Sequence, residues 1–187
     1  MDRLIIRNFK YLFLFFFIIF LNSILNAEEM IIGEEKIDPG IELIFEGAIK
    51  DNIFPEEFYL SEKKSDIHIE VLATWSNDGP VGSVEGGFVP YLEIKVKIIN
   101  QKTLKSVSYD LVPHINLTDN FHYASNIKLP GKQDDFFEVI FDIKPPSNGR
   151  LGYHYDWRES VNKNLISKKT FIYKDQNFSK WASLTRR

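Results

Sequence analysis

The fold of this chain is decided by residues 65–75, which read Ser-Asp-Ile-His-Ile-Glu-Val-Leu-Ala-Thr-Trp. Apolar side chains occupy every second position from Ile67 to Ala73. A period of two residues is typical of a strand that turns one face to a core and the other outward. His68 and Glu70 fall between the apolar positions, so they share the outward face, where an imidazole and a carboxylate can converge on a cation.

Further stretches show the same alternation, with turn-forming segments rich in Gly and Pro between them. The sequence therefore predicts one all-β domain, an antiparallel sandwich or barrel. The tail beyond Asp175 is polar, and we expect it to be loosely attached. The alternating stretches are 40–49, 91–99, 107–111, 137–143 and 169–173, and the turn segments are 78–80, 86–87, 130–131 and 145–149.

Residues 1–27 have the pattern of a secretory signal peptide. Three basic residues, the last of them Lys10, precede an apolar run from Tyr11 to Leu21, and the small residue Ala27 stands before two glutamates. An uncleaved membrane anchor is the alternative, although the apolar run is shorter than the roughly 20 residues that span a bilayer comfortably. Cleavage after Ala27 would leave residues 28–187 as a single domain, exported to the periplasm.

The composition excludes several kinds of protein. The chain contains no cysteine, which rules out disulfides, thiolate metal sites, cysteine nucleophiles and a lipoprotein anchor. Residues 28–187 carry 20 basic and 25 acidic side chains, a net charge of −5. An acidic protein of this kind is a poor candidate for binding nucleic acid. No motif for a small organic substrate stands out.

The four histidines are the candidate ligands of a metal site: His68, His114, His122 and His154. The last three lie next to predicted turns, where loops commonly carry functional side chains on a rigid scaffold. No compact metal motif such as H-E-x-x-H occurs. Spacing alone therefore favours histidines that are scattered over the surface and bind nothing.

Four segments change this interpretation. They are residues 66–70 (Asp-Ile-His-Ile-Glu), 87–92 (Gly-Phe-Val-Pro-Tyr-Leu), 122–128 (His-Tyr-Ala-Ser-Asn-Ile-Lys) and 145–156, which contains Pro-Pro-Ser and His-Tyr-Asp. In this order they resemble the D-I-H-x-E, G-x-W/F-x-P-Y-L, H-Y-G-x-N-x-K and P-P-S…H-x-D segments of the periplasmic high-affinity iron transport proteins. These are copper-binding proteins that are often encoded beside an iron permease.

The resemblance implies an immunoglobulin-like antiparallel β-sandwich that forms a homodimer, with the metal site near the dimer interface. It implies that all four histidines are ligands, together with Glu70, and that Glu42 matches a family glutamate near the site. An ordinary exposed strand residue is an equally good interpretation of Glu42. The metal expected from the resemblance is Cu2+, Fe2+ or Fe3+, and imidazole and carboxylate ligands would also accept Zn or Mn in vitro.

The chain departs from the family pattern at one ligand. His114 stands where the family has a methionine, and the stretch from there to His122 is one residue longer. Exchange of a thioether for an imidazole should weaken the preference for Cu(I) and favour divalent ions.

The sequence thus predicts a periplasmic metal-binding protein that acts with an inner-membrane iron permease in high-affinity iron uptake. The alternatives are a copper-dependent iron redox enzyme or a copper-tolerance protein that uses the same site, and a structural sandwich that binds no metal.

Overall fold

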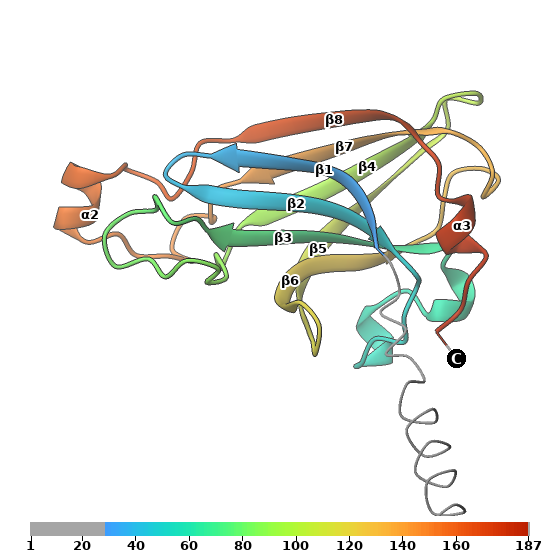
Figure 1. Ribbon diagram of the computed structural model, residues 1–187, viewed down its shortest axis with the longest axis horizontal. Coiled ribbons are helices and arrows are strands. Elements are labelled where there is room, and N and C mark those ends of the chain that lie inside the picture. The colour runs from blue at the N-terminus through green and yellow to red at the C-terminus, as the bar shows by residue number, and fades with distance from the viewer. Residues whose placement is uncertain (1–28, 187) are drawn as a thin grey trace, which may run out of the picture.

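The computed structural model describes residues 29–186 and contains eight strands, all paired antiparallel. The predicted signal peptide, residues 1–27, lies outside the described residues. The strands form one hydrogen-bonded series in the order β1-β2-β3-β6-β5-β4-β7-β8 (Figure 1). They are β1 (Met30–Ile37), β2 (Ile41–Ala48), β3 (Ile67–Trp75), β4 (Glu93–Asn100), β5 (Ser106–Asn116), β6 (Asn120–Ile127), β7 (Phe137–Lys144) and β8 (Lys169–Gln176).

Short helices complete the fold. Two 3-10 turns, η1 (Glu56–Phe58) and η2 (Glu62–Lys64), lie between β2 and β3, and α2 (Tyr155–Ser160) and α3 (Ser179–Ala182) flank β8. Figure 1 shows η1, η2 and α3 at one end of the molecule and α2 at the other. Within residues 29–186, no helix is long and apolar enough to cross a membrane.

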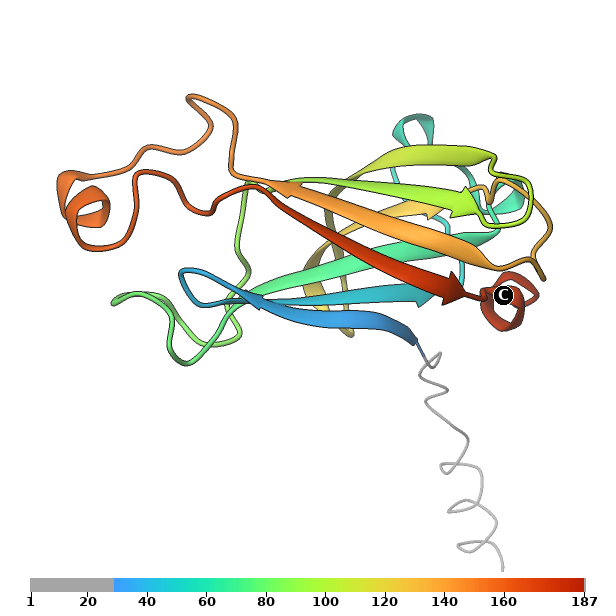
Figure 2. The ribbon, with the colours of Figure 1, turned by 90° about the horizontal axis from the view of Figure 1, so that it is seen from above.

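The sheet folds back on itself because β5 is shared between two layers. Its first half pairs with β4, up to Leu111 opposite Ile94, and its second half pairs with β6, from Val112 opposite Ala124. Figure 2 shows β1 to β3 on one side and β4 with β7 on the other. The outer strands β1 and β8 then meet, since Tyr173 donates a hydrogen bond to Glu35 at 3.2 Å. The result is a nearly closed barrel of eight strands.

The alternating positions predicted from the sequence fill the space between these layers. Phe45 on β2 and Phe141 on β7 are fully buried, with ring centroids 4.4 Å apart. Tyr123 on β6 is also fully buried, and its hydroxyl group donates to the Val89 carbonyl at 2.8 Å and accepts from the Leu92 amide at 3.0 Å. One side chain therefore satisfies a carbonyl and an amide group of the segment that leads into β4.

The all-β antiparallel prediction is confirmed, whereas the finer prediction of an immunoglobulin-like sandwich is not. Two strands, β1 and β6, were absent from the sequence prediction. The sequence places His122 next to a predicted turn, yet residues 120–127 form a strand that carries it. The expected loose tail is wrong, because Phe178 is fully buried and Ala182 is 2% exposed.

Tyr123→Phe should lower the free energy of unfolding by about 1–3 kcal/mol, because the Leu92 amide and the Val89 carbonyl lose their common partner in a buried place. Urea unfolding followed by circular dichroism measures this. Tyr109→Phe is the control, since this half-buried tyrosine accepts only one long bond, from the Lys128 amide at 3.2 Å. Equal decreases in the free energy of unfolding in the two variants would show that the Tyr123 hydroxyl group contributes no more to stability than that of Tyr109.

Candidate metal centre

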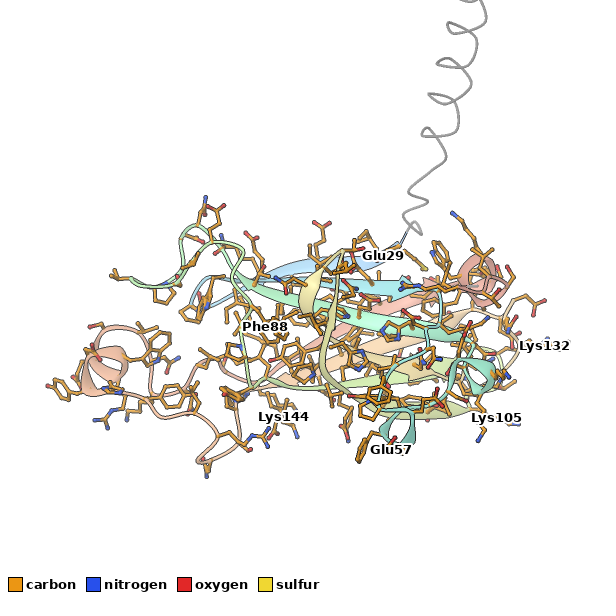
Figure 3. All side chains as sticks on the ribbon, turned by 90° about the horizontal axis from the view of Figure 1, so that it is seen from below. Glu29, Glu57, Phe88, Lys105, Lys132 and Lys144 are labelled. Atoms are coloured by element: carbon orange, nitrogen blue, oxygen red, sulfur yellow. The ribbon has the colours of Figure 1, made fainter. Side chains whose placement is uncertain are left out.

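The candidate site lies on the outward face of β3, β6 and β5, opposite the core. The strand register sets it: His68 is paired with Asn126, Glu70 with Ala124, and His114 with His122. Directly paired residues of neighbouring strands point to the same side of a sheet. The small side chain of Ala124 leaves room in the middle of this group. Figure 3 shows this side of the molecule, with η1 and β6 toward the viewer. Glu29 is labelled near the upper edge of the view and Glu57 near the lower edge.

The segment between β2 and β3 covers this face. His68, Glu70 and His122 are 4%, 1% and 2% exposed although they point away from the core. They line one side of a cavity of about 340 Å³ whose other walls include Asp51, Tyr59 and Arg186. The sequence placed His68 on a polar face correctly, but its burial comes from residues of the chain that carry no alternating pattern.

Asn126 fixes the tautomer of His68. Its side-chain nitrogen donates to the carbonyl groups of Asp51 at 2.7 Å and Leu60 at 2.8 Å, so its oxygen faces His68. That oxygen accepts the Nδ1 proton of His68 at 2.9 Å and the Asp51 amide at 3.2 Å. The Nε2 atom of His68 is therefore left with a lone pair, which is the form of histidine that binds a metal.

His122 is oriented in the same way. Its Nδ1 atom lies 3.1 Å from the Asn120 carbonyl oxygen. A carbonyl only accepts, so Nδ1 carries the proton and Nε2 carries the lone pair. Asn120 reaches this place with a φ of 61°, in the left-handed region that Asn tolerates at the end of a tight turn.

The Glu70 carboxylate faces both of these nitrogens. Its Oε1 lies 3.6 Å from Nε2 of His68, and its Oε2 lies 3.7 Å from Nε2 of His122. Both separations are too long for hydrogen bonds. Among the described residues, Glu70 Oε2 and His114 Nε2 are buried without a hydrogen-bond partner. Buried polar atoms without partners are rare, and at a functional site they indicate a ligand or ion.

The third histidine completes the donor set. The ring of His114 lies 5.5 Å from that of His68 and 6.0 Å from that of His122. Ligand atoms of these three side chains lie within 4.8 Å of one another. Metal–nitrogen bonds are about 2.0–2.1 Å long, so an ion between the rings needs only small side-chain adjustments. The residues present therefore fit a metal held by three imidazoles and the Glu70 carboxylate.

A row of carboxylates continues from Glu70. Glu46 on β2 is paired directly with Glu70, and the carboxyl oxygens of Glu29, Glu46 and Glu70 come within 4.8 Å of one another. Asp119, in the turn before β6, forms a similar group with Glu70 and His122. Glu70 thus belongs to both the imidazole cluster and the carboxylate row.

Burial dominates the electrostatics of these groups. Loss of water raises the pKa of Glu70 to about 8, with further contributions from Glu29 and Asp119. Burial likewise raises the pKa of Glu46 to about 7, and lowers the pKa of His68 to about 3 and that of His114 to about 4. The metal-free site therefore favours neutral imidazoles and neutral carboxyl groups. A bound cation would reverse the preference of the carboxyl groups and displace their protons.

Two predicted ligands lie elsewhere. His154 is exposed at the N-terminus of α2, at the end of the molecule opposite η1 and η2 (Figure 1). Glu42 is exposed on β2, opposite Thr74. It shares a strand face with Glu46 but lies four residues, roughly 13 Å, further along the strand. Glu46, not Glu42, is the glutamate at the site, and only the register of β2 against β3 distinguishes the two.

The fold and the site together define a class: an antiparallel β-barrel with a buried cluster of imidazoles and carboxylates suited to a metal ion. Residues 26–179 match the sequence profile of a family described as Fe2+ transport protein. The chain belongs to this family. A search of proteins with curated function gave no significant match.

Solved structures share the fold. A copper-bound variant of P19 from Campylobacter jejuni is 26% identical, with a TM-score of 0.69 over 80% of this chain and 97% of that one. Copper-reconstituted P19 from the same organism has a TM-score of 0.69 at 24% identity, covering 80% and 96% of the two chains. A copper-bound variant of FetP from uropathogenic Escherichia coli strain F11 has a TM-score of 0.67 at 21% identity, covering 79% and 95%.

The stability of the metal-free protein should fall as the pH rises from about 6.5 to 8. Over this range the folded protein keeps protons on Glu46 and Glu70 that the unfolded chain has already released, so folding is favoured at the lower pH. Below about pH 6.5 the lowered pKa values of His68 and His114 act in the opposite direction, because the unfolded chain then binds protons that the buried rings reject. Thermal unfolding in a chelator measures the profile.

Glu70→Gln should flatten this profile, since a neutral amide removes the larger of the two carboxyl contributions. Exposed Glu42→Gln is the matched control and should leave the profile unchanged. A wild-type protein more stable at pH 8 than at pH 6.5 without metal would contradict the assignment.

Proposed function

We propose that this protein is an exported, periplasmic metal-binding component of high-affinity iron uptake. It binds copper between His68, His114 and His122 with Glu70, and it presents iron to an inner-membrane iron permease. The observation that carries the proposal is the convergence of the Nε2 atoms of His68 and His122 on the buried Glu70 carboxylate, whose Oε2 has no hydrogen-bond partner among the described residues. The family supports the connection with iron, and the copper-bound relatives support copper.

The donor atoms divide the site chemically. Imidazoles suit copper and other late divalent metals, whereas carboxylates are harder donors that suit iron and manganese. Copper, when bound, supplies a redox-active cation. Iron is the cargo, and we assign it to the carboxylate row of Glu29, Glu46 and Glu70. Glu70 lies between both groups, so its charge is available to either ion.

We further propose a homodimer, as the family resemblance implies. In one chain His154 lies far from the other three histidines, so it can join them only from a second copy. Exposed apolar side chains at the rim of the cavity, among them Phe54 at 85% and Ile115 at 65%, favour a protein partner on this face. A second copy and a permease are the two partners that the proposal names.

A copper-dependent iron redox enzyme is the second candidate, favoured by the close approach of the imidazole cluster to the carboxylate row. The two functions differ in turnover. A carrier reacts with iron once per site, whereas an enzyme oxidises or reduces iron repeatedly when the second substrate is in excess. Iron oxidation state followed by a ferrous chelator, with copper-loaded protein at one-hundredth of the iron concentration, separates them.

His68→Ala and His122→Ala should each weaken Cu(II) binding by at least about 100-fold, because each removes an oriented imidazole. Chelator competition at pH 7.5 measures the affinity, with Glu42→Gln as the control. His154→Ala adds a test of the dimer: a loss of affinity would indicate that a second copy supplies this ligand. Wild-type affinity in both His68→Ala and His122→Ala would exclude the site.

His114→Met should raise the affinity for Cu(I) relative to Cu(II) by about tenfold or more, because a thioether is a softer donor than an imidazole. Parallel titrations with Cu(I) and Cu(II) against chromophoric chelators give the ratio. A wild-type protein that already prefers Cu(I), with no change in the variant, would show that His114 does not set the metal preference.

A further inference from the structure

The C-terminal segment, residues 177–186, is packed against the body of the protein. Phe178 is fully buried, with its ring centroid 6.0 Å from that of Phe137. It also lies over Gly47 of β2, where an added Cβ would approach the ring to 3.0 Å. The buried Lys50 donates a hydrogen bond to the Ala182 carbonyl at 2.6 Å. The segment therefore has a defined course, which leads from β8 to the cavity.

At the end of this course Arg186 lines the cavity that holds His68, Glu70 and His122. Its guanidinium group forms an ion pair with Asp51, Nη1 to Oδ2 at 2.7 Å. Its Nε is buried and has no hydrogen-bond partner among the described residues. The match to the family profile ends at residue 179, so Arg186 lies beyond the matched region.

A fixed positive charge in this position opposes the binding of a cation. Arg186 is close enough to act on the ligands, because it lines the same cavity as His68, Glu70 and His122. Asp51 offsets part of this charge. Asp51 is in turn linked to His68, because its amide and carbonyl groups both bind the Asn126 side chain that holds the imidazole.

We propose that Arg186 sets the affinity and the release rate of the bound metal, with Asp51 as its counter-charge. This inference rests on the proposed metal-binding function and adds a residue that regulates it. The guanidinium group keeps the affinity below the value that three imidazoles and a carboxylate would otherwise give. Glu70 also belongs to the carboxylate row to which we assign iron, so the same charge would limit how tightly the cargo is held, and the release rate rises as the affinity falls.

The test is a set of charge variants titrated with Cu(II) alone against a chelator. Arg186→Gln should bind Cu(II) about three- to tenfold more tightly and release it correspondingly more slowly, as expected when a unit charge no longer acts on a divalent ion across a partly solvated cavity. Arg186→Lys keeps the charge and should stay within about twofold of wild type. Asp51→Asn should weaken binding, because it leaves the guanidinium group without its counter-charge. Exposed Lys97→Gln, on β4, also removes one positive charge and is the control.

The salt dependence distinguishes an electrostatic role from a structural one. The difference between wild type and Arg186→Gln should shrink when the ionic strength is raised from 0.01 M to 0.5 M. Weaker Cu(II) binding by Arg186→Gln would overturn the inference, and so would a difference in affinity that salt leaves unchanged. Either result would show that the C-terminal segment has only a structural role at the cavity. Equal affinity in wild type and Arg186→Gln would overturn it while leaving the metal site intact. A wild-type protein that binds no Cu(II) would remove the proposed function as well.

Discussion

The candidate metal centre depends on one constraint, the antiparallel register of β3 with β6 and of β6 with β5. Because side chains alternate between the faces of a strand, this register places His68 and Glu70 beside His122, and His122 beside His114. A slip of one residue between β3 and β6 would turn either the β3 pair or the other two side chains toward the core, and a slip between β6 and β5 would separate His114 from the other three. The same alternation packs Phe45 and Tyr123 between the layers, so the core that stabilises the fold also fixes the geometry of the site.

The buried titratable groups of the site lower the stability of the metal-free protein. Glu46 and Glu70 lie in an environment that favours their protonated forms, and His68 is held neutral by burial. Such groups reduce stability near neutral pH, and a cation compensates them. The hydrogen bonds of Asn126 and the Asn120 carbonyl hold the imidazoles in their binding orientation before an ion arrives. The site is therefore organised in advance, at the expense of the stability of the metal-free state.

The sequence predicted what depends on local periodicity, and it failed where distant segments meet. The alternation around His68 identified a strand and a polar face. The family resemblance then named His122 and Glu70 as ligands. Neither could separate Glu42 from Glu46, because that choice depends on how β2 pairs with β3. Arg186 was missed for the same reason: a polar tail shows no period, and its position follows from the burial of Phe178.

The hairpin between β5 and β6 shows how the chain tolerates a change in length beside its metal centre. His114 and His122 are paired across this hairpin, and only residues 117–119 and the left-handed Asn120 lie at its tip. An extra residue at the tip leaves the pairing of the two histidines unchanged, because the strands keep their register below it. A longer loop can therefore change the surface beside the candidate site while His114 and His122 keep their positions.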